Sequence, residues 1–204
     1  MSGFWDKRQT PAKSETLSLK LPYQDPAIVQ RLSQQISRFL EPLPRERRIV
    51  VVCVGTDRST GDSLGPLVGT MLERETSPHF DLYGTLDEPV HAMNLSETLH
   101  KIMRNSREPF IIAVDACLGQ VSSVGCIQLG AGPVRPGAGV NKELPPVGDI
   151  HLTGIVNVGG FMEYFVLQNT RLNLVMKMAD LIALSVLKAI HQTRGELIPY
   201  AMPD

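Results

Sequence analysis

Two short runs of apolar residues constrain the fold of this 204-residue chain more than any other feature. Residues 49–54 read IVVVCV and residues 110–114 read FIIAV, so bulky apolar side chains would face both sides of an extended chain. Strands that are apolar on both faces are typical of the interior of a parallel sheet covered by helices. The sequence therefore predicts an α/β protein.

Helical patterns alternate with these strands. Apolar residues recur at helical spacing in four stretches, namely 28–40, 64–72, 95–103 and 172–190. Two weaker strands are expected, at 80–86 and 124–129. Alternating helices and strands predict a three-layer α/β/α sandwich around a mainly parallel sheet.

Three of the expected helices carry end signals. Asp25 and Pro26 predict an N-cap and a first helical position, and Asn94 with Glu97 resembles a capping box. The last helix is expected to begin near residues 169–170 and to have Gly195 as its C-cap.

The chain is expected to form one domain with a polar extension. Residues 1–22 are polar and lack periodicity, so they predict a flexible N-terminal arm before a single domain at 23–204. Within that domain, residues 130–148 hold five glycines and four prolines. A connection of this length is typical of a lid, a binding loop or a disordered segment, and the sequence leaves these open.

The composition excludes several partners. Twenty basic and 21 acidic residues give a net charge of −1, which argues against general nucleic-acid binding. The longest apolar run is too short to span a bilayer, and the N-terminal residues lack the apolar core of a secretory signal. Three cysteines without paired spacing suit a reducing compartment, so we expect a cytoplasmic protein without membrane partners.

Two acidic residues follow the strong strands. Asp62 lies in the loop after the first strand, and Asp115 directly follows the second. Because the carboxyl ends of parallel strands share one edge of the sheet, neighbouring strands would place both carboxylates in one crevice. Close carboxylates repel, so the pair can hold one proton and can activate water while protonating a leaving group.

Each candidate also has a structural interpretation. Asp62 is equally suited to cap a helix, Asp115 to cap a turn, and Asp57 to form a turn. The glycine-rich loop at 55–61 is one residue too long for a P-loop, and Asp62 stands where such a loop has lysine.

Two nucleophile hypotheses stay open. Residues 61–64 spell GDSL, the signature of a family of serine esterases with Ser63 as nucleophile, although no Asp-x-x-His follows. Cys117 could pair with His151, but a buried cysteine is also common as packing. His151 itself could orient a carboxylate, bind a metal or contact the substrate, or it could be an ordinary surface histidine.

Three sequence blocks together resemble the YyaC family of sporulation proteins from spore-forming Firmicutes. The resemblance spans residues 25–195, and its blocks are VVCVGTDRSTGDSLGPLVGTML, IIAVDACLG and GIVNVGGFMEYFVLQNTRLNLVMKMADLIA. Relatives of that family are the germination protease, which degrades small acid-soluble spore proteins, and the hydrogenase maturation endopeptidases. The resemblance implies an α/β/α sandwich of the phosphorylase/hydrolase type and a location in the forespore or sporulating cell.

The resemblance also implies roles for particular residues. The proposed catalytic aspartates of the germination protease correspond to Asp62, in DSLGP, and to Asp115, in VDACLG. The maturation endopeptidases instead have Glu at position 62 and a later His around a metal. Thr56 replaces the Asn of their first loop, so the sequence leaves the need for a metal cofactor undecided.

We therefore expect a peptidase-like hydrolase in which Asp62 and Asp115 share a water molecule. The substrate would be a protein or peptide, and the chain could form a homo-oligomer. Glycines allow close approach of a peptide backbone. The residues expected to shape or line the substrate site are Gly55, Thr56, Gly61, Gly65 and His151, with the loop at 130–148 covering it. The alternative is a non-catalytic sporulation factor that binds a protein partner in the same crevice.

Overall fold

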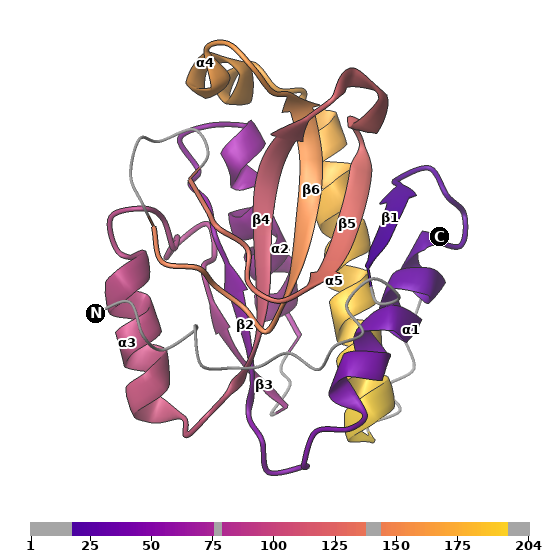
Figure 1. The fold of residues 1–204 in the computed structure, drawn as a ribbon, viewed down its shortest axis with the longest axis vertical. Coiled ribbons are helices and arrows are strands. Elements are labelled where there is room, and N and C mark those ends of the chain that lie inside the picture. The colour runs from indigo at the N-terminus through magenta and orange to yellow at the C-terminus, as the bar shows by residue number, and fades with distance from the viewer. Residues whose placement is uncertain (1–17, 76–78, 138–143, 196–204) are drawn as a thin grey trace.

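The fold is a three-layer α/β/α sandwich built on one six-stranded sheet (Figure 1). The computed structural model describes residues 18–75, 79–137 and 144–195. Its strands are β1 (Leu19–Pro22), β2 (Ile49–Cys53), β3 (Phe80–Tyr83), β4 (Phe110–Gly119), β5 (Cys126–Ala131) and β6 (Ile150–Val158). Its helices are α1 (Ile28–Leu40), α2 (Leu64–Glu73), α3 (Leu95–Asn105), α4 (Glu163–Gln168) and α5 (Leu172–Arg194), with short 3₁₀ turns η2 (Gly61–Ser63) and η3 (Val121–Ser123).

The strand order is β1-β5-β6-β4-β2-β3. Neighbouring strands from β3 through β2 and β4 to β6 are parallel, whereas β5 runs antiparallel to β6 and β1 antiparallel to β5. The expected strands at 49–54 and 110–114 are β2 and β4, which are neighbours in the interior of the sheet. This arrangement confirms the prediction of a mainly parallel sheet.

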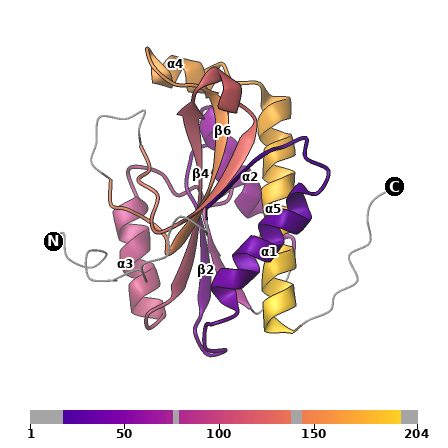
Figure 2. The same cartoon turned by 45° about the vertical axis from the view of Figure 1, so that its right-hand side comes forward.

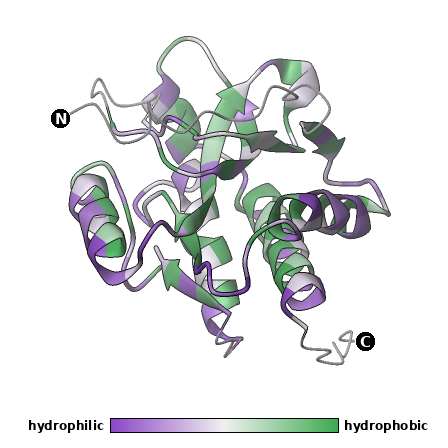
Figure 3. Cartoon of the chain, turned by 60° about the horizontal axis from the view of Figure 1, so that its bottom comes forward, coloured by the Kyte–Doolittle hydropathy of each residue, from purple (hydrophilic) through white to green (hydrophobic). Residues whose placement is uncertain are grey.

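Helices cover both faces of the sheet. Helices α1, α2 and α5 pack together on one face, and α3 lies on the other (Figure 2). Val51 and Cys53 join the core under α1, α2 and α5, whereas Val50 and Val52 join a second core under α3. In Figure 3 the strands are mostly hydrophobic, and hydrophilic residues lie on the outward surfaces of the helices. Successive side chains of β2 point into two different cores, which explains why both faces of the strand are apolar.

Two expected caps take other roles. The Asp25 carboxylate accepts a hydrogen bond from the backbone N–H of Ala27 (2.8 Å), so Asp25 and Pro26 form a turn and α1 begins only at Ile28. The Asn94 side chain accepts from the N–H of His91 (2.8 Å) and makes no cap bond to α3, so the expected capping box does not form. In contrast, Gly195 ends α5 in the left-handed conformation, as expected.

Four element boundaries differ from the expectation. The end of the expected arm belongs to the sheet, because Leu19–Pro22 pairs with β5 as strand β1. Residues 1–17 lie outside the described residues. Strand β3 ends at Tyr83, three residues early, and β5 begins at Cys126 rather than Val124. Strand β4 continues to Gly119, so Asp115 lies inside the strand rather than at its end.

The glycine- and proline-rich connection begins and ends at the amino ends of the parallel strands. Strand β5 extends to Ala131, and Val134 and Val147 form an antiparallel bridge that packs on the core under α3. Residues 138–143 of this connection lie outside the described residues. The described flanks therefore do not cover the carboxyl ends of β2 and β4. Among the described helices, none is long and apolar enough to cross a membrane.

Glycine is required where α2 meets the end of β2. A Cβ at Gly65 would lie 2.1 Å from the carbonyl oxygen of Val54. Real Cβ atoms do not approach a backbone oxygen this closely, so a side chain there would push α2 away from the sheet. The helix that follows Asp62 is therefore held by direct backbone contact.

Replacing Gly65 with Ala should destabilise the fold although alanine favours helices. We expect the free energy of unfolding to fall by about 1–3 kcal/mol, the usual range for overpacking. Urea denaturation measures this change. Glu73→Ala, at the exposed end of the same helix, is the control and should change stability by less than about 0.5 kcal/mol. Equal effects of the two substitutions would contradict the close contact.

Candidate functional site

The candidate site lies where β2 ends and β4 continues. The last paired residues of the two strands are Cys53 and Val114. The N–H of Val54 still donates to the carbonyl of Val114 (2.7 Å), and the N–H of Gly55 then donates to Val90 on the far side (2.8 Å). The chain after β2 therefore turns away from β4, and Asp115 is the first residue of β4 beyond this pairing.

Asp62 reaches the same place from the turn η2. This turn contacts β4, α4 and α5, and its position is fixed by backbone contacts. The carbonyl of Asp62 accepts from the N–H of Thr56 (3.1 Å), and a Cβ at Gly55 would lie 2.0 Å from that same oxygen. The loop after β2 thus folds back on itself and holds Asp62 beside β4.

The Asp115 carboxyl holds its proton near neutral pH. Burial, with a smaller contribution from the negative charge of Asp62, raises its pKa to about 8, against one hydrogen bond from the N–H of Ala116 (2.9 Å). The turn η2, which carries Asp62, contacts β4, which carries Asp115, so the two carboxyl groups lie within electrostatic reach of one another. The structure thus brings the predicted pair together.

Asp62 is the more acidic member of the pair. Burial raises its pKa above the ordinary value, but the Ser59 hydroxyl lowers it again. Ser59 is buried, and its oxygen forms no other hydrogen bond in the part of the chain that the structure describes. It makes no regular hydrogen bond to Asp62 either, but it lies near enough to favour the ionised carboxylate. At neutral pH we expect one proton on the pair, located on Asp115.

Ser59 was missed by sequence reasoning. A serine in a loop of turn-forming residues gives no signal that separates it from Thr60 or Ser63. Only the folded loop shows that its hydroxyl is buried near a carboxylate.

The glycines of the loop have a packing role in this structure. Like Gly55 and Gly65, Gly61 has no room for a side chain, because a Cβ would lie 2.7 Å from Leu167 of α4. The close approach that these glycines permit is that of the protein's own chain. Contact of these glycines or of Thr56 with a substrate remains a prediction.

His151 lies away from the carboxylate pair. It is paired with Ala113, whereas Asp115 is paired with Thr153, so His151 is two residues closer to the amino end of the sheet. Its ring contacts Gly130 of β5, and Nδ1 lies 2.9 Å from the carbonyl oxygen of Gly132. A role for His151 beside the two aspartates therefore has no support in this geometry.

Neither alternative nucleophile has a suitable setting. The Ser63 hydroxyl is buried and donates to the carbonyl of Thr60 (2.7 Å), which argues against the serine esterase. Burial raises the pKa of the Cys117 thiol, which interacts with Thr153. His151 pairs with Ala113, four residues before Cys117 along β4, so it does not activate this thiol. Asp57 is exposed in the loop, as expected of a turn residue.

A metal site of the maturation-endopeptidase type does not fit these residues. Asp62 and Asp115 supply only two carboxyl groups, and His151 is directed elsewhere. Across the described ranges, no group of three or more His, Cys, Asp or Glu side chains could hold a metal ion.

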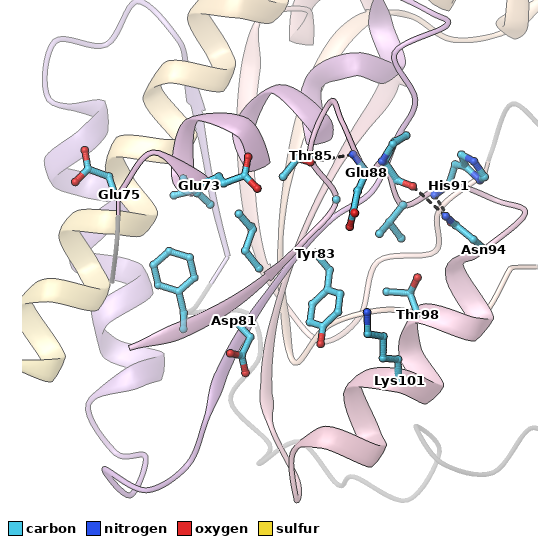
Figure 4. Close-up of a pocket in the computed structure, with 16 residues that line it drawn as sticks. Glu73, Glu75, Asp81, Tyr83, Thr85, Glu88, His91, Asn94, Thr98 and Lys101 are labelled. Atoms are coloured by element: carbon cyan, nitrogen blue, oxygen red, sulfur yellow. Dashed lines mark hydrogen bonds between the residues drawn. The ribbon is translucent and has the colours of Figure 1, made fainter. Parts of the chain in front are cut away.

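A separate groove of about 860 Å³ lies along the outer edge of β3 (Figure 4). It runs between the end of α2 and α3, and Lys101 lies 5.8 Å from the ring of Tyr83 in it. Neither Asp62 nor Asp115 lines this groove. The candidate site is therefore identified by its two carboxyl groups and not by the volume of this groove.

The fold and the two carboxyl groups together define an α/β/α protein with a pair of acidic residues toward the carboxyl edge of its sheet. The chain belongs to the family described as "Protein of unknown function (DUF1256)", whose model matches residues 20–185. It is 59% identical over 154 residues to "Uncharacterized protein YyaC" of Bacillus subtilis (strain 168), across 74% of this chain and 75% of that protein. This relation confirms the family resemblance seen in the three sequence blocks.

A comparison of structures finds the [NiFe] hydrogenase maturation protease HycI from Thermococcus kodakarensis KOD1. The TM-score is 0.49 at 18% sequence identity, and the match covers 71% of this chain and 92% of that one.

The raised pKa of Asp115 predicts a pH-dependent stability. An unfolded aspartate titrates near pH 4, so between about pH 4 and 8 only the folded state keeps this proton. Stability should therefore fall as pH rises through this window, by up to about 1.4 kcal/mol per pH unit. Chemical denaturation of the wild type and of Asp115→Asn at several pH values tests this. The free energy of unfolding of the wild type should fall with pH relative to that of Asp115→Asn. Parallel plots of this free energy against pH for the two proteins would contradict the raised pKa of Asp115.

Proposed function

We propose that this protein is a peptidase-like hydrolase that acts in the cytoplasm of the sporulating cell or forespore. The observation that carries the proposal is the unequal pair, in which Asp115 holds a proton up to a pKa of about 8 beside the more acidic Asp62. Hydrolysis of a peptide bond needs a base for water and an acid for the leaving nitrogen. The resemblance of DSLGP and VDACLG to the germination protease supports the same assignment.

The unequal pKa values assign the two roles. Asp62, ionised, accepts a proton from water as the water oxygen bonds to the peptide carbonyl carbon. Asp115 then donates its proton to the nitrogen as the carbon–nitrogen bond breaks. Transfer of the proton from Asp62 to Asp115 restores the pair, with a carboxylic acid and an amine as products. Ser59 is a positioning residue, since it favours the ionised form of Asp62.

Removing either carboxyl group should remove hydrolysis. We expect Asp62→Asn and Asp115→Asn to lower the rate by about 10²–10⁴-fold, the usual contribution of general acid–base catalysis. A small acid-soluble spore protein is the first substrate to test, with cleavage followed by mass spectrometry. Asp57→Asn, exposed in the same loop, is the matched control and should cleave at the wild-type rate.

Cleavage that persists in both variants would contradict the mechanism. Tight binding of the spore protein without cleavage, unchanged by Asp62→Asn, would instead support the non-catalytic partner-binding role.

The pH profile tests the assignment of acid and base. Activity should rise as Asp62 ionises and fall as Asp115 loses its proton near pH 8. Ser59→Ala removes the hydroxyl that lowers the pKa of Asp62, so the acidic limb should move to higher pH. The alkaline limb should stay in place. A shift of the alkaline limb alone would reverse the two roles, and an unchanged profile would exclude Ser59 as a positioning residue.

A further inference from the structure

The short helix α4 and the two residues before it present an apolar surface beside the carboxylate pair. Phe161 is 88% exposed, and Met162, Tyr164 and Phe165 are each more than half exposed. Large apolar side chains in such positions mark contact sites when they gather on one element. We call these four residues the α4 surface. Helix α4 lies above the carboxyl ends of β4 and β6 (Figure 1).

The opposite side of α4 is firmly attached. Leu167 is buried against Gly61, the residue before Asp62. The Asn157 side chain of β6 donates to the carbonyl of Val166 (3.3 Å) and to the hydroxyl of Thr170 (3.2 Å). The apolar side chains are therefore held outward by a fixed helix, next to the turn that carries Asp62.

Strand β4 offers a free edge at the same place. The carbonyl of Val114 faces β2, since it accepts from Val54, and N–H and C=O groups alternate between the two sides of a strand. Ala116 therefore also turns its N–H and C=O away from β6, but its N–H already donates to the Asp115 carboxyl (2.9 Å), which leaves its carbonyl to accept from a bound peptide. Gly119 faces β6, since its carbonyl accepts from Gly159, so the N–H and C=O of Leu118 also point to the open side. In the described part of the chain, no strand pairs with this side of β4 beyond Val114. Unpaired strand edges bind extended peptides.

We propose that an extended polypeptide segment with apolar side chains binds along the free edge of β4 at Asp115–Gly119, with those side chains on the α4 surface. The proposal rests on the proposed function, because it makes this segment the part of the substrate next to the cleaved bond. Pairing with β4 places a peptide bond beside Asp62 and Asp115. Side chains on one face of the bound segment then contact Phe161 and its neighbours at every second residue.

A peptide library tests the proposal even though the natural substrate is not identified. The probe is a set of acetylated and amidated octapeptides with randomised positions, applied to the Asp62→Asn/Asp115→Asn double variant so that bound peptides survive. The retained peptides should be enriched in apolar side chains at alternate positions. Adding Phe161→Ser and Phe165→Ser should lower their affinity by about tenfold or more, whereas Met93→Ser, an equally exposed control on another segment, should not.

Backbone pairing has its own readout. On binding of a retained peptide, the amide NMR signal of Leu118 should shift, and N-methylation of the peptide at alternate positions should abolish binding. No enrichment, or binding indifferent to the α4 substitutions, would overturn the proposal. A wild-type dimer that dissociates on Phe161→Ser/Phe165→Ser would also overturn it, because a second copy would then cover the surface.

The two proposals fail in different ways. If peptides are retained in this manner but never cleaved by the wild type, the peptidase proposal would be wrong and the docking site would still be supported. If peptides are cleaved with a KM that Phe161→Ser/Phe165→Ser leaves unchanged, the docking site would be wrong and the peptidase proposal would still be supported.

Discussion

The unequal lengths of two neighbouring strands shape the candidate site. Strand β2 stops pairing at Val114, whereas β4 continues to Gly119 along β6. Asp115 is thus the first residue of β4 without β2 beside it, and the turn with Asp62 lies there instead. The close contacts of Gly55 and Gly65 keep that turn against the end of the sheet. The carboxyl groups of Asp62, in η2, and Asp115, in β4, are thereby placed close enough for the charge of one to affect the other.

Burial then separates the properties of the two aspartates. The Asp115 carboxyl is enclosed and feels the charge of Asp62, so it retains its proton to about pH 8. The Ser59 hydroxyl lowers the pKa of Asp62 and opposes the effect of burial there. Two identical side chains become an acid and a base through their surroundings alone.

Much of this structure follows from local sequence patterns, and the remainder depends on tertiary contacts. Apolar runs at 49–54 and 110–114 identify the central strands, because a chain buried on both faces must be apolar throughout. The extension of β4 to Gly119 has no such pattern, since β6 supplies its pairing. Asn94 has a capping sequence, yet its side chain bonds to His91. The sequence also did not predict that His151 lies away from Asp115, because this distance depends on the register between β4 and β6.

The most direct test of the account is a titration of the two carboxyl groups by ¹³C NMR in protein labelled at aspartate. We expect Asp115 to titrate near pH 8 and Asp62 at lower pH, and we expect Asp62→Asn to lower the pKa of Asp115 by removing a nearby negative charge. Two carboxyl groups that titrate independently near pH 4 would show that no proton is held by the pair, and the proposed division into acid and base would then be wrong.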